Sequence, residues 1–147
     1  MTTTAPFPYA SFLADLQAAH GSAALARMPP VKGDAGALTE VLVALLQARK
    51  ATLQAAFDTT LAADELRRYQ KYAKPGKPSA HIVQLRQKQA AARVASSLSR
   101  QSLIKAAAAF VREAGIEVPE RVALDAFITH WIDANVPRDN GADATSS

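Results

Sequence analysis

The residues of this chain whose types and spacing could do chemistry gather in one basic segment. Residues 66–112 contain eleven Lys or Arg and no Asp or Glu, a net charge of +11. The segments on either side are mildly acidic, with net charges of −2 for residues 1–65 and −5 for residues 113–147. Solvated helix faces usually mix both signs, so a long one-sign segment predicts a polyanionic partner such as a nucleic acid. The alternative is that it neutralises acidic faces of the same protein or of a second subunit.

Within that segment, the nine residues LSRQSLIKA at 98–106 have the pattern of a helix start that contacts DNA. Ser99 stands where an N-cap would, and Arg100, Gln101 and Ser102 would occupy the exposed first turn. Arg, Gln and Ser at a helix start can contact base edges and phosphates, and the free N–H groups there favour a phosphate. The alternative interpretation is an ordinary capped, alanine-rich helix.

These nine residues resemble the second half of a helix-turn-helix and, equally, the second-helix start of ribbon-helix-helix regulators. Either resemblance implies a DNA-binding regulator. The chain departs from the first pattern at Arg93, where a small residue is usual, and at Ser97, where Gly is usual in the turn. For the second, the strand would be residues 81–86, and the spacer from there to Ser99 is several residues short. Neither resemblance identifies a family.

The other basic residues of the segment are expected to bind the phosphate backbone. Arg86, Arg93 and Arg100 recur every seven residues. Tyr69 and Tyr72 lie among the lysines and could stack on unpaired bases, although tyrosines at helical spacing more often belong to a core. The complete set of predicted nucleic-acid contacts is Arg67, Arg68, Lys71, Lys74, Lys77, Arg86, Arg93, Ser99, Arg100, Gln101, Ser102 and Lys105.

The sequence contains no recognisable constellation for catalysis. His20, His81 and His130 lie far apart, and none has a second His or a carboxylate at ligand spacing. The chain has no glycine-rich phosphate loop and no nucleophile elbow. It also has no Cys, which excludes disulfides and thiolate metal sites. We therefore expect a protein that is not an enzyme and holds neither a cofactor nor a metal.

The elements that must position the basic residues are predicted to be helices. An apolar face at i, i+3, i+4 and i+7 begins at Tyr9, and residues 27–36 form a proline- and glycine-containing linker. Asp34 is the expected N-cap of a long helix. The pattern leaves open whether that helix ends near Thr59 and Thr60 or continues toward residue 73. Its expected buried side consists of Leu38, Val41, Leu42, Leu45, Leu46, Leu53, Ala56 and Phe57.

After a loop at 74–79, the hydrophobic pattern predicts two further helices, at about 80–97 and 100–114. At about 100° per residue, the apolar residues before and after Ser99 fall on nearly opposite sides, which one straight helix against one core cannot use. The first set is Ala91, Val94, Ala95 and Leu98, and the second is Leu103, Ile104, Ala107, Phe110 and Val111. Gly115 is the expected end, and Pro119 is expected to open a last helix.

The sequence thus predicts an all-α protein, a compact bundle of about four to five helices with disordered termini. We expect a flexible segment at 1–6, a single helical domain at 7–135 and a disordered tail at 136–147. Without a secretory signal or a membrane span, the expected location is the cytoplasm. The predicted function is DNA binding by a homodimer, with duplex DNA favoured over RNA. The alternative is a helical assembly or chaperone-like protein whose basic segment docks on an acidic protein.

Overall fold

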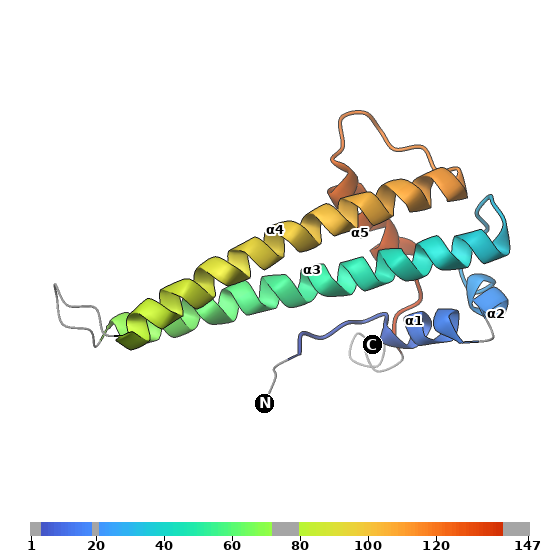
Figure 1. Ribbon diagram of the computed structural model, residues 1–147. Helices are drawn as coiled ribbons and strands as arrows, with labels where there is room; N and C mark the ends of the chain where they lie inside the picture. The colour runs from blue at the N-terminus through green and yellow to red at the C-terminus, as the bar shows by residue number, and fades with distance from the viewer. Residues whose placement is uncertain (1–3, 19–20, 72–79, 140–147) are drawn as a thin grey trace.

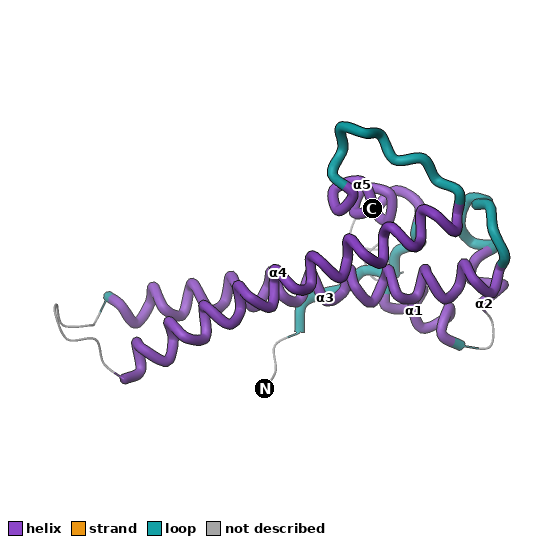
Figure 2. Tube along the Cα trace, turned by 45° about the horizontal axis from the view of Figure 1, so that its top comes forward, coloured by secondary structure: helices purple, strands orange, loops and turns teal. Residues whose placement is uncertain are grey.

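The computed structural model describes residues 4–18, 21–71 and 80–139, and within them the fold is all-helical, without strands (Figures 1 and 2). The helices are α1 (Ala10–Gln17), α2 (Gly21–Leu25), α3 (Ala35–Gln70), α4 (Ala80–Ala114) and α5 (Leu124–Asn135). The predicted all-α class is confirmed. Helices α3 and α4 run side by side as a long hairpin, and the shorter helices pack at one end of it. No helix in these ranges is long and apolar enough to cross a membrane.

Helix α3 is continuous over 36 residues, which answers the question that its sequence pattern leaves open. Asp34 caps it as expected, because its carboxylate accepts a hydrogen bond from the backbone N–H of Ala37 at 3.2 Å. The hydroxyls of Thr59 and Thr60 donate to backbone carbonyls four residues earlier, at 2.8 and 3.1 Å. These hydroxyls are satisfied inside the helix, so the threonines do not end it.

Helix α4 is also continuous, over 35 residues, and the prediction of two helices at 80–97 and 100–114 is wrong. Ser99 is not an N-cap, because its hydroxyl donates to the carbonyl of Ser96 within the helix, at 2.8 Å. The residues assigned to the first apolar face are exposed, with Val94 59% and Leu98 58% accessible. Of the two opposite apolar faces that the sequence pattern predicts here, the first is therefore not buried against the rest of the chain.

A single inward stripe explains why α4 continues without a break. Its positions are three or four residues apart, much as in a coiled coil. The middle of the stripe is small or polar, so hydropathy alone does not reveal it. The inward residues, buried or half-buried, are Ile82, Leu85, Gln89, Ala92, Ser96, Ser99, Leu103, Ala107, Phe110 and Ala114.

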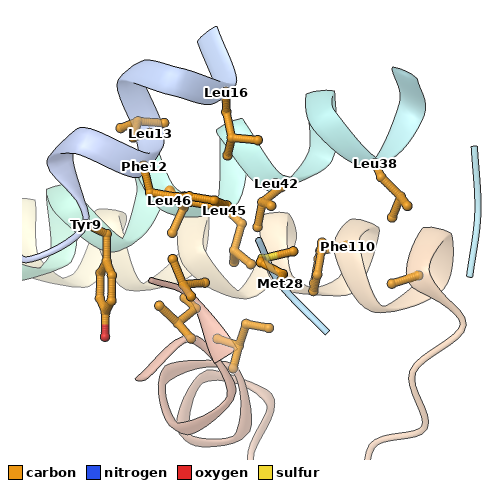
Figure 3. Packing of buried hydrophobic residues seen from close by; sticks show 14 of the residues in the cluster. Tyr9, Phe12, Leu13, Leu16, Met28, Leu38, Leu42, Leu45, Leu46 and Phe110 are labelled. Carbon is orange, nitrogen blue, oxygen red and sulfur yellow. The ribbon is translucent and has the colours of Figure 1, made fainter. Parts of the chain in front are cut away.

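The hydrophobic core lies at one end of the hairpin, where α1, α2 and α5 pack on α3 and α4 (Figure 3). We call this part the head; on the long helices it covers residues 35–54 and 96–114. The largest fully buried side chains all belong to it: Tyr9, Phe12, Leu42, Leu45, Leu46, Phe110, Ile128 and Ile132. Residues 55–71 and 80–95 form the distal hairpin, whose separate cluster consists of Leu66, Ile82 and Leu85.

Two predicted helix boundaries are the glycine end of α4 and the proline start of the last helix. Gly115 has φ +67°, and the N–H of Ile116 donates to the Val111 carbonyl at 2.9 Å, so the predicted glycine end at 114–115 is confirmed. The expected start of the last helix at Pro119 is wrong, because α5 begins at Leu124. The Pro119 carbonyl instead accepts from the N–H of Val122 at 3.2 Å, which makes a turn.

The described ends of the chain pack against the head. Val136 is 4% exposed, and the N–H of Asp139 donates to the Pro8 carbonyl at 2.7 Å. The N–H of Ala5 donates to the side-chain oxygen of Gln54 at 2.7 Å. Residues 4–6 and 136–139, which belong to the segments 1–6 and 136–147 expected to be flexible and disordered, are within the described ranges, and Ala5, Val136 and Asp139 contact the head. The remaining residues of those segments lie outside the described ranges.

Candidate nucleic-acid interface

The predicted phosphate contacts fall into three groups on the structure. Arg67, Arg68 and Lys71 lie at the C-terminal end of α3, and Arg86 and Arg93 lie on α4; all five are exposed on the distal hairpin. Ser99, Arg100, Gln101, Ser102 and Lys105 lie on α4 within the head. Lys74 and Lys77 lie outside the described residues. The structure thus brings five of the predicted residues to one end of the molecule.

Carboxylates neutralise only part of the distal hairpin. Asp64 pairs with Arg67 at 3.4 Å, and Glu65 of α3 pairs with Lys88 of α4 at 3.3 Å. Within the described residues, Arg68, Lys71, Arg86 and Arg93 have no carboxylate partner. Helix α4 itself contains no Asp or Glu before Glu113. On the distal hairpin, α4 therefore contributes exposed cations and no carboxylate.

The seven-residue repeat of arginines forms a row along one flank of α4. Seven residues advance an α-helix by about 10 Å and leave the side chain within about 20° of its starting direction. Within the described residues, Arg86 and Arg93 of this row have no carboxylate partner. Arg100 is exposed but paired, because its Nε donates to a carboxylate oxygen of Asp125 in α5 at 2.8 Å. The row therefore ends in an ion pair where the head begins.

The continuity of α4 changes the expected role of residues 99–102. Only the first four N–H groups of a helix lack a partner within the helix, and here those belong to the start at Ala80. The backbone N–H groups near Arg100 are thus unavailable to a phosphate. Gln101 and Ser102 are exposed on the side of a helix instead of its first turn. The geometry of a helix-turn-helix is not present in these residues.

Tyr69 is exposed on the distal hairpin, so the core role favoured by its spacing is wrong. Its side chain is 43% accessible, and its ring meets the ring of His81 edge-on, with the centroids 4.6 Å apart. The pair joins the end of α3 to the start of α4. An exposed aromatic ring close to Arg68 and Lys71 in sequence could stack on an unpaired base. Tyr72 lies outside the described residues.

Ser99 and Arg100 also line a pocket of about 520 Å³ between α3, α4 and α5. Its other residues are Arg49, Thr52, Ser96, Leu103, Asp125, Ala126, Thr129, His130 and Asp133. Sequence analysis missed Arg49, although a signal was present. The spacing of Leu38, Leu42, Leu45, Arg49 and Thr52 places this arginine on the inward stripe of α3. A charged residue at an inward position is rare unless it has a partner or a ligand.

One titrating group near the pocket has a displaced pKa. The pKa of Tyr9 is raised to about 12, mainly by burial and also by the hydrogen bond from its hydroxyl to the Asp133 carboxylate. The proton therefore stays on Tyr9, and Asp133 stays an acceptor. Within the described residues, no group of three or more His, Asp or Glu side chains has the arrangement of a metal site.

No protein-family model, curated protein or solved structure matches this chain. Function must therefore be inferred from the chain's own residues.

Proposed function

We propose that this chain is a non-enzymatic nucleic-acid-binding protein that holds the phosphate backbone with its distal hairpin. The supporting observation is a group of exposed cations that have no carboxylate partner among the residues that the structure describes: Arg68, Lys71, Arg86 and Arg93. Phosphate contacts of this kind supply most of the sequence-independent affinity of DNA-binding proteins, through the release of counterions. A regulator or an accessory factor of replication, partition, transfer or packaging would use such a surface.

Duplex DNA is the proposed ligand because two of these cations, Arg86 and Arg93, lie along the side of one helix. The major groove of B-DNA is wide enough to admit an α-helix, whereas that of A-form RNA is deep and narrow. Contacts from the side of α4 fix position on the backbone and carry little sequence information. We therefore propose binding with weak sequence preference. A homodimer, which would double the number of phosphate contacts, and a cytoplasmic location belong to the same proposal.

The salt dependence of binding to random duplex DNA tests this function. The logarithm of the binding constant should fall linearly with the logarithm of salt concentration, and Arg93→Ala should reduce that slope by about one unit. Lys50→Ala is the matched control, since Lys50 is an exposed cation of α3 within the head. Fluorescence anisotropy with a labelled duplex measures both. The proposal fails if the protein does not bind DNA at low salt, or if both variants weaken binding equally.

Exposed apolar residues beside the arginine row favour a second candidate function, docking on an acidic protein. Val94 and Leu98 are one turn apart on the outer side of α4, and each is more than half exposed. A helical assembly or chaperone-like protein would use them together with Arg93. In that case Val94→Asp should abolish association measured by light scattering, while the protein shows no salt-dependent binding to DNA.

A further inference from the structure

We propose that the pocket between α3, α4 and α5 binds a small organic carboxylate, a monoanion, through the guanidinium group of Arg49. This site is separate from the cations of the distal hairpin, and the inference does not depend on nucleic-acid binding. It rests on three observations: the unsatisfied hydrogen-bonding groups of Arg49, the charges around it, and the mixed lining of the pocket.

Arg49 is half-buried, and its hydrogen-bonding capacity is mostly unused. Its Nη1 donates to the hydroxyl of Thr52 over a long distance, 3.4 Å. Its Nε is buried and has no acceptor among the described residues. A guanidinium N–H without an acceptor in a desolvated place is costly, because it has lost water and gained nothing. An oxygen atom brought into the pocket would remove that cost.

The charged side chains around the pocket are two arginines, Arg49 and Arg100, and two aspartates, Asp125 and Asp133. Asp125 is paired with Arg100 at 2.8 Å. Asp133 accepts the hydrogen bond of Tyr9. Arg49 has no carboxylate partner among the described residues. A carboxylate would give Arg49 a partner, whereas a phosphate dianion would bring a second negative charge toward the two aspartates.

The shape of the guanidinium group fits a carboxylate. Because Nη1 donates to Thr52, Nε and Nη2 make up the other edge of the guanidinium group; Nε is buried, so binding requires the side chain to turn this edge toward the pocket. Two parallel N–H groups match the two oxygens of a carboxylate. The hydroxyl of Ser96 adds a polar contact, while Leu103 and Ala126 add apolar surface. A volume of about 520 Å³ accommodates the organic part of such a ligand.

Titrations with sodium acetate and sodium benzoate, at constant ionic strength against sodium chloride, test the site by NMR. The amide signals of Thr52, Ser99 and Thr129 should shift in a saturable way. Benzoate should bind more tightly than acetate, because its ring covers the apolar part of the lining. Arg49→Gln should raise the dissociation constant about tenfold or more, because it removes a charge-assisted pair of hydrogen bonds. Lys50→Gln, a neighbouring exposed cation, should leave it unchanged.

Two further variants keep the test independent of the folding of Arg49→Gln. Arg49→Lys keeps the positive charge but removes the two parallel N–H groups that match a carboxylate, so this variant should lose most of its affinity for benzoate. Ala126→Leu fills the pocket from α5 without altering Arg49, and it should also prevent binding. The inference is overturned if no carboxylate gives saturable shifts, or if Ala126→Leu binds like the parent chain. It is equally overturned if inorganic phosphate binds as tightly as benzoate.

Discussion

Tyr9 and Asp133 form the contact between residues that most directly ties the start of the described chain to α5. Tyr9 is 1% exposed, and its hydroxyl donates to the Asp133 carboxylate. Burial and this bond raise the pKa of Tyr9 from 10.0 to about 12. Between these two pH values the unfolded chain releases the phenolic proton and the folded chain keeps it. The contribution of this group to stability is therefore full below pH 10 and is lost as the pH rises toward about 12.

Tyr9→Phe should lower the free energy of unfolding at neutral pH by about 1–2 kcal/mol, because it leaves the Asp133 carboxylate without its donor. The variant should also lose less stability than the parent chain when the pH is raised from 9 to 11. Urea unfolding followed by circular dichroism at both pH values measures this. Equal alkaline losses in the two proteins would show that another group titrates.

At the scale of elements, local signals predicted two helix ends, whereas the expected cap at Ser99 and the expected start at Pro119 were wrong. The Asp34 cap and the glycine end at Gly115 depend on a few neighbouring residues, and both were predictable. The inward face of α4 depends on what α3 presents to it. Thr59 of α3 reaches the carbonyl of Ala92 at 3.4 Å, so small and polar residues can lie at this interface. A hydropathy pattern could not reveal such a stripe, and for this reason α4 was divided in two.

For the candidate sites too, features that depend on neighbouring residues could be predicted, and features that depend on packing could not. The charge of residues 66–112 can be counted in the sequence, and most of the described basic residues are exposed, as a phosphate-binding surface needs. The partner of Arg100 could not be predicted, because Asp125 is brought to it by the packing of α5. The pocket around Arg49 joins three helices, so no local pattern could locate it.

Ser97→Pro tests the continuity of α4. In a two-helix arrangement residue 97 would lie in the connection, where proline is tolerated. In the continuous helix, proline removes a hydrogen bond and clashes with the preceding turn, which costs about 3 kcal/mol or more. Ser97→Ala, at the same exposed position, should cost nothing. Thermal and urea unfolding of the two variants measures the difference, and equal stability would show that the helix is interrupted here.

At the scale of the whole molecule, the buried side chains are unevenly distributed between the head and the distal hairpin. The head contains all of the largest buried residues, whereas the distal cluster consists of Leu66, Ile82 and Leu85. Regions with few buried apolar contacts open more readily than the rest of a protein. The surface proposed to bind DNA is thus carried by the less stable part of the fold.

Two variants of buried residues should show whether the head and the distal hairpin unfold independently. Phe110→Ala should lower the global free energy of unfolding by about 3–5 kcal/mol, because Phe110 is fully buried in the head. Leu85→Ala should mainly speed hydrogen exchange in residues 60–71 and 80–90, with a smaller effect on α1 and α5. Native-state hydrogen exchange and urea unfolding measure both. A uniform increase of exchange throughout the molecule in Leu85→Ala would show that the two parts unfold together.

The contact between Asp139 and Pro8 joins two segments that a ribosome makes at very different times. The Asp139 N–H donates to the Pro8 carbonyl, and its carboxylate accepts from the N–H of Ser11 at 3.0 Å. The entropic cost of closing a chain segment rises with its length, and this contact closes nearly the whole described chain. On a ribosome, residues 8–11 emerge long before residue 139 and must wait for it. We therefore expect α1 to reach its final place only after residue 139 has been synthesised.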